Sequence, residues 1–171
     1  SNMEFLQSAW TLFTDNWQVF LRGAYTALLL AIIGTIIGAL IGFFIGIMHT
    51  IPQRTKSAKT FLLKIFNFIL TAYVEIFRGT PMMVQAMVVF YGLVYLGIDI
   101  DRFLAASIVI SLNTGAYMAE YVRGGIVSID KGQFEAAQAI GMNHLQTMLY
   151  VVIPQVGRNI LPATGNQFVM N

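Results

Sequence analysis

The sequence predicts an all-α integral membrane protein, and three observations support this fold class. Of the 171 residues, 57% are hydrophobic and only 11% are charged, whereas a water-soluble domain carries about 25% charged residues. Several apolar runs approach or exceed the roughly 18 residues that indicate a membrane-spanning helix. The basic residues gather between these runs, as is typical of membrane proteins. We therefore expect the lipid bilayer to be a partner of the chain and the cell membrane, crossed several times, to be its location.

Composition also excludes several kinds of chemistry. The absence of cysteine removes disulfides, thiol catalysis and the usual zinc and iron–sulfur ligand sets. A net charge of +2 is too small to indicate a nucleic-acid partner. The phosphate-binding pattern GxxxxGK[ST] does not occur, so we expect no nucleotide site and no cofactor in this chain.

The first predicted span covers residues 23–48 and follows an N-terminal segment, 1–22, that we place outside the cell. These 26 residues carry no charge, and at ~1.5 Å per residue they exceed the ~30 Å of hydrocarbon. Glycines recur every fourth residue within the span and therefore share one helix face: Gly34, Gly38, Gly42 and Gly46. Such a face favours close packing against another helix. A glycine stripe that lines a pore is the alternative.

Residues 50–79 are predicted to form a basic cytoplasmic loop followed by a helix that lies at the membrane surface. Four basic residues fall close together here: Arg54, Lys56, Lys59 and Lys64. The apolar stretch between Lys64 and Glu75 is too short for a full crossing, which is why we favour an interfacial helix over a span.

Three further spans are predicted, over 81–96, 103–122 and 145–169. The second begins after Thr80, which can cap a helix, and Pro81, which suits a first helical turn. If the four spans alternate, seven of the ten basic residues share one side of the membrane. By the positive-inside rule that side is the cytoplasm, and the N-terminus lies outside.

A short polar helix is predicted on the cytoplasmic side within residues 130–143, "DKGQFEAAQAIGMN". Asp130 and Gln133 form an N-terminal capping pattern, and Gly141 is a natural left-handed stop. Asn143 can cap the following helix. The roughly eight residues between the caps make a rod of about 12 Å. Small side chains give it a slim side that a partner could grip, although an ordinary connector between two spans has the same pattern.

Polar groups inside spans are costly in lipid and are therefore candidates for a solute path. Asn113, Tyr117 and Glu120 lie at i, i+4 and i+7 of the third span, which puts them on one face. Interhelical hydrogen bonding is the structural alternative for Asn113. For Glu120 the alternative is an ion pair with Arg123, three residues further along.

Arg158 is predicted to lie deep in the fourth span, about nine residues or about 14 Å along the helix when counted from Leu149. Pro162 leaves the carbonyl of Arg158 without its helical donor, and an irregular helix at a buried cation is tolerated where it lines a cavity. A substrate carboxylate or an internal acid such as Glu120 could neutralise the cation.

An enzyme is a weaker alternative. The acidic turn "DID" at 99–101 could bind a divalent metal, and His49 or His144 could act as a base. The two aspartates lie at the outer surface, however, and neither histidine belongs to an HExxH or GxSxG motif. We therefore expect no catalytic residue and no metal site.

Three segments together resemble the permease subunits of ABC transporters, in particular the polar amino-acid uptake permeases of the histidine, glutamine and arginine type. They are "YVEIFRGTPMMVQ" at 73–85, "GAYMAEYVRGGIVSIDKGQFEAAQAIGM" at 115–142 and "VIPQVGRNILPATGNQF" at 152–168. The resemblance implies the type I ABC importer permease fold. It identifies 130–143 as the coupling helix of the Glu-Ala-Ala loop, whose contacts to the ATPase would be Gly132, Glu135, Ala136, Ala137 and Gly141.

The resemblance also implies partners. They are two ABC ATPase subunits that bind ATP and Mg, a second permease chain in a homo- or heterodimer, an extracytoplasmic solute-binding protein, and a polar or charged amino acid as substrate. In the family a fifth helix follows the position of Asn171, so a chain ending there would lack part of the transport core. A membrane scaffold that binds partner helices without transporting is the alternative function. It explains the glycine face but not the buried polar residues.

Overall fold

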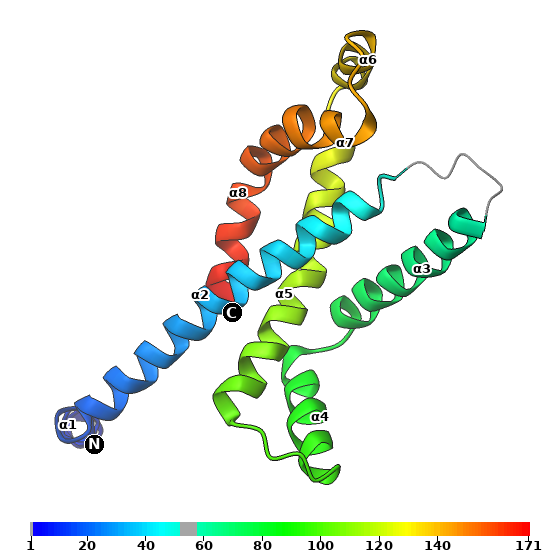
Figure 1. The fold of residues 1–171 in the computed structure, drawn as a ribbon. Helices are drawn as coiled ribbons and strands as arrows, with labels where there is room; N and C mark the ends of the chain where they lie inside the picture. The colour runs from blue at the N-terminus through cyan, green and yellow to red at the C-terminus, as the bar shows by residue number, and fades with distance from the viewer. Residues whose placement is uncertain (1, 52–57) are drawn as a thin grey trace.

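The computed structural model describes residues 2–51 and 58–171, and these residues are helical apart from short connections (Figure 1). The long helices run in roughly the same direction and cross at moderate angles, which is the arrangement expected of a membrane-embedded bundle (Figure 1). The predicted basic residues Arg54 and Lys56 and the side chain of Lys59 fall outside the described part. The all-α class predicted from composition is confirmed.

The N-terminal segment is itself helical. α1 covers Asn2–Asp15, and α2 covers Trp17–Met48, so α2 begins six residues before the predicted span. The two helices are separated at Asn16, whose backbone leaves the helical region and whose side-chain amide donates to the carbonyl of Leu12 (3.0 Å).

The glycine face of α2 packs against α5, Arg102–Val127, and this is the most extensive contact between helices described in the structure. The four glycines Gly34, Gly38, Gly42 and Gly46 meet, in the same order, Ile110, Thr114, Met118 and Val122 of α5. A Cβ on Gly42 would lie 2.6 Å from the carbonyl carbon of Met118, so only glycine permits this approach. Helix packing, the preferred interpretation of the stripe, is confirmed.

α3 covers Ala58–Gly79, and whether it lies at the membrane surface, as predicted, or crosses the membrane stays a prediction. Its C-terminal half packs against the middle of α5, where the Tyr73 hydroxyl donates to the carbonyl of Leu112. α4, Met82–Tyr95, then continues toward the N-terminal end of α5 (Figure 1). α3 and α4 thus follow one another along α5, with the break between them near the middle of α5. The prediction that 81–96 forms a span stays a prediction.

The interior is formed mainly by α5 and by the last helical segment of the chain. After α6, Lys131–Ala139, this segment comprises α7 (His144–Gln146), a π-helical turn (η1, Thr147–Val152) and α8 (Ile153–Met170). Met118 and Val122 of α5 pack there against Met148, Val152 and Val156. These three segments adjoin and form one helical run from 144 to 170, close to the predicted limits of 145–169.

A polar network joins three helices at the end of α8. The side-chain oxygen of Asn171 accepts from Thr114 of α5 (2.9 Å), and its nitrogen donates to Thr35 of α2 (3.1 Å). Gln167, only 2% exposed, donates to the same oxygen of Asn171 at 3.4 Å. These bonds satisfy polar groups that would otherwise be buried without partners.

Three helical stretches in the described part of the chain are long and apolar enough to cross a membrane: Trp17–Met48, Thr60–Gly79 and Arg102–Val127. α4 is apolar but shorter, and the polar side chains of α8 keep it out of this group. The prediction that 145–169 forms a span therefore stays a prediction.

Candidate functional site: a capped helix and a charged pocket

α6 stands apart from the long helices at one end of the molecule (Figure 1). Asp130 caps its start, but the carboxylate accepts from the amide of Gly132 (2.6 Å), one residue earlier than the predicted box would have it. Gly141 adopts a left-handed conformation with φ of +83°, and the amides of Gly141 and Met142 bond back to the carbonyls of Gln138 and Ala137. This is a Schellman stop, as predicted at Gly141.

The next helix begins with a complete capping box. The side chain of Asn143 accepts from the amide of Gln146 (2.9 Å), and the side chain of Gln146 accepts from the amide of Asn143 (2.9 Å). Both ends of the 130–143 segment are thus fixed by local hydrogen bonds, which makes α6 a short helix of defined direction.

The faces of α6 are divided differently from the prediction. Ala137 is only 3% exposed, and Phe134 packs against the core cluster of α5 and η1. The expectation that Ala137 faces a partner needs correction, because this side chain attaches α6 to its own chain. Glu135, Ala136 and Ala139 are exposed, as is Gly132.

Two further contacts connect the α6 region to the bundle. The side-chain amide of Gln155 in α8 donates to the side-chain oxygen of Gln133 at 3.4 Å. His144, directly after the α6 stop, lies 3.3 Å from the hydroxyl of Thr50, just beyond the end of α2. The segment around α6 is thus linked to α8 and to the residues that follow α2.

Glu120 lies at the centre of a charged cluster between α3 and α5. Its carboxylate accepts two hydrogen bonds from the Nε of Arg123 (3.1 Å each) and one from that residue's terminal nitrogen. On the α3 side, a terminal nitrogen of the Arg78 guanidinium lies 3.7 Å from Glu120 Oε2. The same guanidinium sits 5.7 Å above the ring centre of Tyr117, within the range of a cation–π contact.

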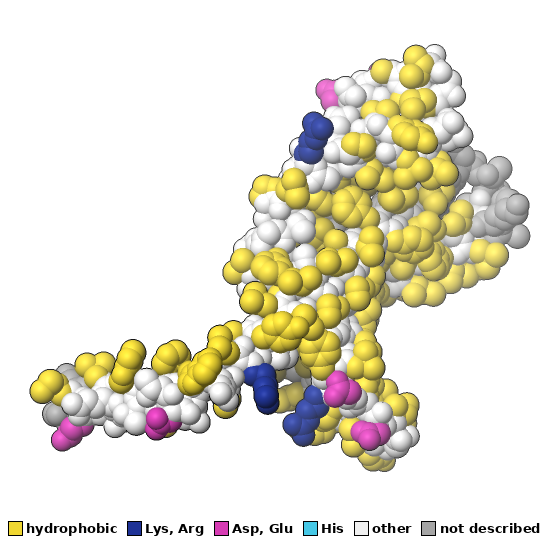
Figure 2. Space-filling model, turned by 60° about the vertical axis from the view of Figure 1, so that its left-hand side comes forward, with side chains coloured by type: hydrophobic (Ala, Val, Ile, Leu, Met, Phe, Trp, Pro, Cys, Tyr) yellow, Lys and Arg dark blue, Asp and Glu magenta, His cyan; other side chains and the backbone are white. Residues whose placement is uncertain are grey.

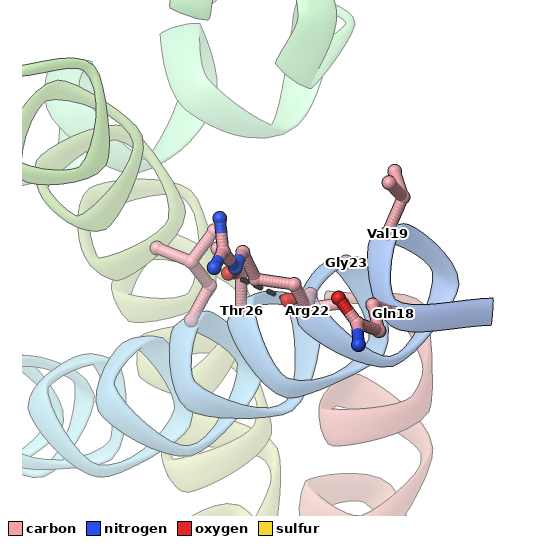
Figure 3. A pocket seen from close by; sticks show the side chains of 7 residues that line it. Gln18, Val19, Arg22, Gly23 and Thr26 are labelled. Carbon is pink, nitrogen blue, oxygen red and sulfur yellow. Dashed lines mark hydrogen bonds between the residues drawn. The ribbon is translucent and has the colours of Figure 1, made fainter. Parts of the chain in front are cut away.

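This cluster borders a pocket of about 220 Å³. Its charged and polar lining comes from α3, α5 and the residue after α2: His49, Thr71, Glu75, Arg78, Glu120 and Arg123. Charges of both signs thus face one small space. A larger hollow of about 620 Å³ is lined by residues of α2 alone (Figure 3), so it is an open helix surface and not an enclosed site.

Asn113, the third predicted path residue on this face, lies at the break between α3 and α4. Its amide donates to the carbonyl of Phe77 (3.3 Å) and to the side chain of Gln85 (3.2 Å). Gln85 in turn donates to the carbonyls of Phe77 and Thr80 (2.9 and 3.0 Å). Asn113 and Gln85 thus satisfy backbone carbonyls that lack helical donors at the break. This is the interhelical hydrogen bonding that was the structural alternative for Asn113.

Arg158 is exposed on α8, and no ion pair of this side chain occurs among the residues that the structure describes. The structure does not pair it with Glu120, whose oxygens face Arg78 and Arg123. Sequence reasoning missed Arg78 and Gln85. The available signal was their position on either side of the Gly79-Thr80-Pro81 break, where polar groups are needed to satisfy a broken backbone.

The enzyme alternative gains no support from the geometry. Asp101 uses its carboxylate to cap α5, accepting from the amides of Phe103 (2.9 Å) and Leu104 (3.2 Å). No group of three potential metal-ligating side chains occurs within 2–51 and 58–171.

The fold and the site define a class: a helical membrane protein that carries a charged pocket between its helices and a capped helix at one end. Residues 55–171 match the family described as "Binding-protein-dependent transport system inner membrane component". The chain belongs to this family.

Individual relatives are also permease subunits of ABC transporters. The chain is 31% identical over 155 residues to the probable glutamine ABC transporter permease GlnM of Bacillus subtilis, covering 91% of this chain and 67% of that protein. It is 40% identical over 116 residues to the glutamine permease GlnP of Escherichia coli, covering 67% of this chain and 53% of the relative. With the arginine permease ArtQ of Bacillus subtilis the identity is 45% over 105 residues, 61% of this chain and 48% of ArtQ. The chain thus spans about half the length of GlnP and ArtQ.

Solved structures show the same fold. A structure titled "Crystal structure of an amino acid ABC transporter with histidines" matches with a TM-score of 0.75 and 35% identity, covering 94% of this chain and 70% of that one. The MetNI methionine ABC transporter matches with a TM-score of 0.71 at 21% identity, covering 91% of this chain and 71% of the other, and this likeness concerns the fold alone. The type I ABC importer permease fold expected from the sequence is confirmed.

Proposed function

We propose that this chain is the transmembrane subunit of an ATP-driven importer of polar or charged amino acids, and that α6 couples it to ATPase subunits. The observation that carries the proposal is the geometry of α6: a helix capped at both ends, attached to its own core by Phe134 and Ala137, and open to a partner along Glu135, Ala136 and Ala139. A connector helix between two spans needs no such exposed small face.

The partners follow from the family. Two ATPase subunits bind ATP and Mg, a second permease chain completes the path, and an extracytoplasmic solute-binding protein delivers the substrate. Relatives named for glutamine, arginine and cystine support a polar or charged amino acid as substrate. The complex resides in the cell membrane, with α6 on the cytoplasmic side.

The path runs along the charged pocket between α3 and α5. An amino acid presents an ammonium and a carboxylate, and the pocket offers Glu120 for the first and the guanidinium groups of Arg78 and Arg123 for the second. Tyr117 and Asn113 extend this face of α5. Arg158 is exposed on α8 and is a further candidate residue of the path.

The coupling role is tested with Glu135→Lys in a complex of the full-length chain with its ATPase, its second permease chain and its solute-binding protein, reconstituted in vesicles. We expect the stimulation of ATP hydrolysis by loaded binding protein to be lost, because the exposed charge at the proposed interface is reversed. Asp99→Lys, the same charge change in the exposed turn before α5 and far from α6 in the chain, is the control for a general charge effect. Normal stimulation with Glu135→Lys would contradict the coupling role. A chain that copurifies with no ATPase would favour the scaffold alternative.

A further inference from the structure

The N-terminal arm, α1 and the first turns of α2, carries an apolar stripe that no part of the chain covers within residues 2–51 and 58–171. Its members are separated alternately by three and four residues, which places them on one helix face. They are Met3, Leu6, Trp10, Phe13, Trp17 and Phe20. All six are exposed, from 49% at Phe13 to 75% at Met3. The spacing continues unchanged across the break at Asn16, so α1 and the first turns of α2 share one apolar face.

A polar stripe runs along the other face with the same spacing. It begins at Glu4 and passes through Thr11 and Asp15 to Gln18 and Arg22. Figure 3 shows the α2 end of this stripe, where Thr26 donates to the carbonyl of Arg22 (2.9 Å). Figure 2 shows the arm projecting to one side of the bundle, with hydrophobic side chains along its upper edge and acidic ones along its lower edge.

The apolar stripe needs a partner outside this chain. Every described side chain of α1 is exposed, yet burying one large apolar side chain is worth about 1.5–3 kcal/mol. Aromatic residues make up four of the six positions, and tryptophan is enriched where membrane meets water. The stripe also continues onto α2, which is itself long and apolar enough to cross the membrane.

We propose that α1 lies flat in the lipid–water interface on the side of the membrane where α2 begins, with this apolar stripe against the acyl chains. In Figure 2 the hydrophobic edge of the arm is on the side toward which the bundle rises. This edge faces the hydrocarbon when α2 crosses the membrane. Within 2–15 the sequence has Glu4 and Asp15 and no lysine or arginine. The binding is therefore driven by apolar burial, and anionic lipid headgroups do not strengthen it.

The chain provides its own probe for this inference. Its two tryptophans, Trp10 and Trp17, both belong to the stripe. With Trp17→Phe, Trp10 is the single tryptophan of this sequence. The full chain is assembled with its partner subunits in phosphatidylcholine vesicles, and the emission of a matched complex with both Trp10→Phe and Trp17→Phe is subtracted to isolate the Trp10 signal. We expect phosphatidylcholine with brominated acyl chains to remove most of the Trp10 emission and aqueous acrylamide to have little effect. Adding phosphatidylglycerol should not increase the lipid quenching.

The matched control moves the reporter to the polar stripe, as Thr11→Trp with both native tryptophans changed to phenylalanine. Its emission should be quenched by acrylamide and spared by the brominated lipid. The proposal is overturned if Trp10 is quenched by acrylamide, or if both positions respond alike. Protection of Trp10 from both quenchers would also overturn it, because the stripe would then be covered by protein, such as a second permease chain.

Discussion

Glu120 is the residue on which the two basic side chains of the pocket converge. It is bonded to Arg123 on its own helix and lies 3.7 Å from Arg78 on the neighbouring one. The side chains of Arg78 and Glu120 are 36% and 27% exposed, so the pair stabilises the fold by less than about 1 kcal/mol. The proposed path role requires this carboxylate to exchange part of its contacts with Arg78 and Arg123 for a substrate ammonium.

Glu120→Gln separates the structural role from the path role. Because a hydrogen bond to a charged group contributes about 1.5–3 kcal/mol, we expect the KM for uptake to rise about tenfold or more. The thermal midpoint of the purified subunit should hardly change. Radiolabelled amino-acid uptake into reconstituted vesicles and thermal unfolding in detergent provide the two measurements.

Asp99→Asn is the control for Glu120→Gln, since it removes one carboxylate charge in the exposed turn before α5. Its uptake should match that of the unchanged protein. A loss of stability in Glu120→Gln with an unchanged KM would assign the cluster to packing alone.

At the scale of elements, the contact between α2 and α5 determines how closely the bundle can close. Gly42→Ala would place a Cβ 2.6 Å from the carbonyl carbon of Met118 and 2.7 Å from the amide nitrogen of Ala119. Both atoms belong to the backbone of α5, so the helices must separate. We expect a destabilisation of about 1–3 kcal/mol, the usual cost of overpacking, measured as a lower thermal midpoint in detergent.

Gly23→Ala lies on the same helix and serves as its control, because nothing approaches within 4 Å of its added Cβ. Alanine is a better helix former than glycine by about 0.5–1 kcal/mol, so the control should be as stable as the parent or slightly more stable. Equal midpoints for the two variants would mean that the glycine face does not pack as described.

The sequence was sufficient for features that depend on spacing or on local chemistry. The four-residue repeat predicted the glycine contact, and Gly141 and Asn143 predicted the caps around α6. It was insufficient for α3, because the charges at Lys64 and Glu75 describe composition and not which turns contact α5. It also could not tell Ala137 from Ala136. On a nine-residue helix with so many small side chains, the hydrophobic periodicity is too short to assign the buried face.

At the scale of the whole molecule, α5 connects the two sites. It contributes Glu120 and Arg123 to the pocket and packs on α2, α3, α4 and α8. α6 follows α5 directly in the chain and contacts η1, which continues into α8. A push on α6 would therefore reach α5, which lines the proposed path, and α8, which packs on α5, and this is the mechanical basis of the proposed coupling.

The most direct test of this coupling uses the absence of cysteine from the chain. Ala136→Cys and Ala137→Cys create single thiols on adjacent residues of α6, one exposed and the other only 3% exposed. In the permease complex without ATPase, a maleimide should label position 136 readily and position 137 slowly. Assembly with the ATPase subunits should slow the labelling of position 136 strongly and leave position 137 unchanged. Labelling of position 136 at the same rate with and without the ATPase would contradict the proposal that this face of α6 is the coupling surface.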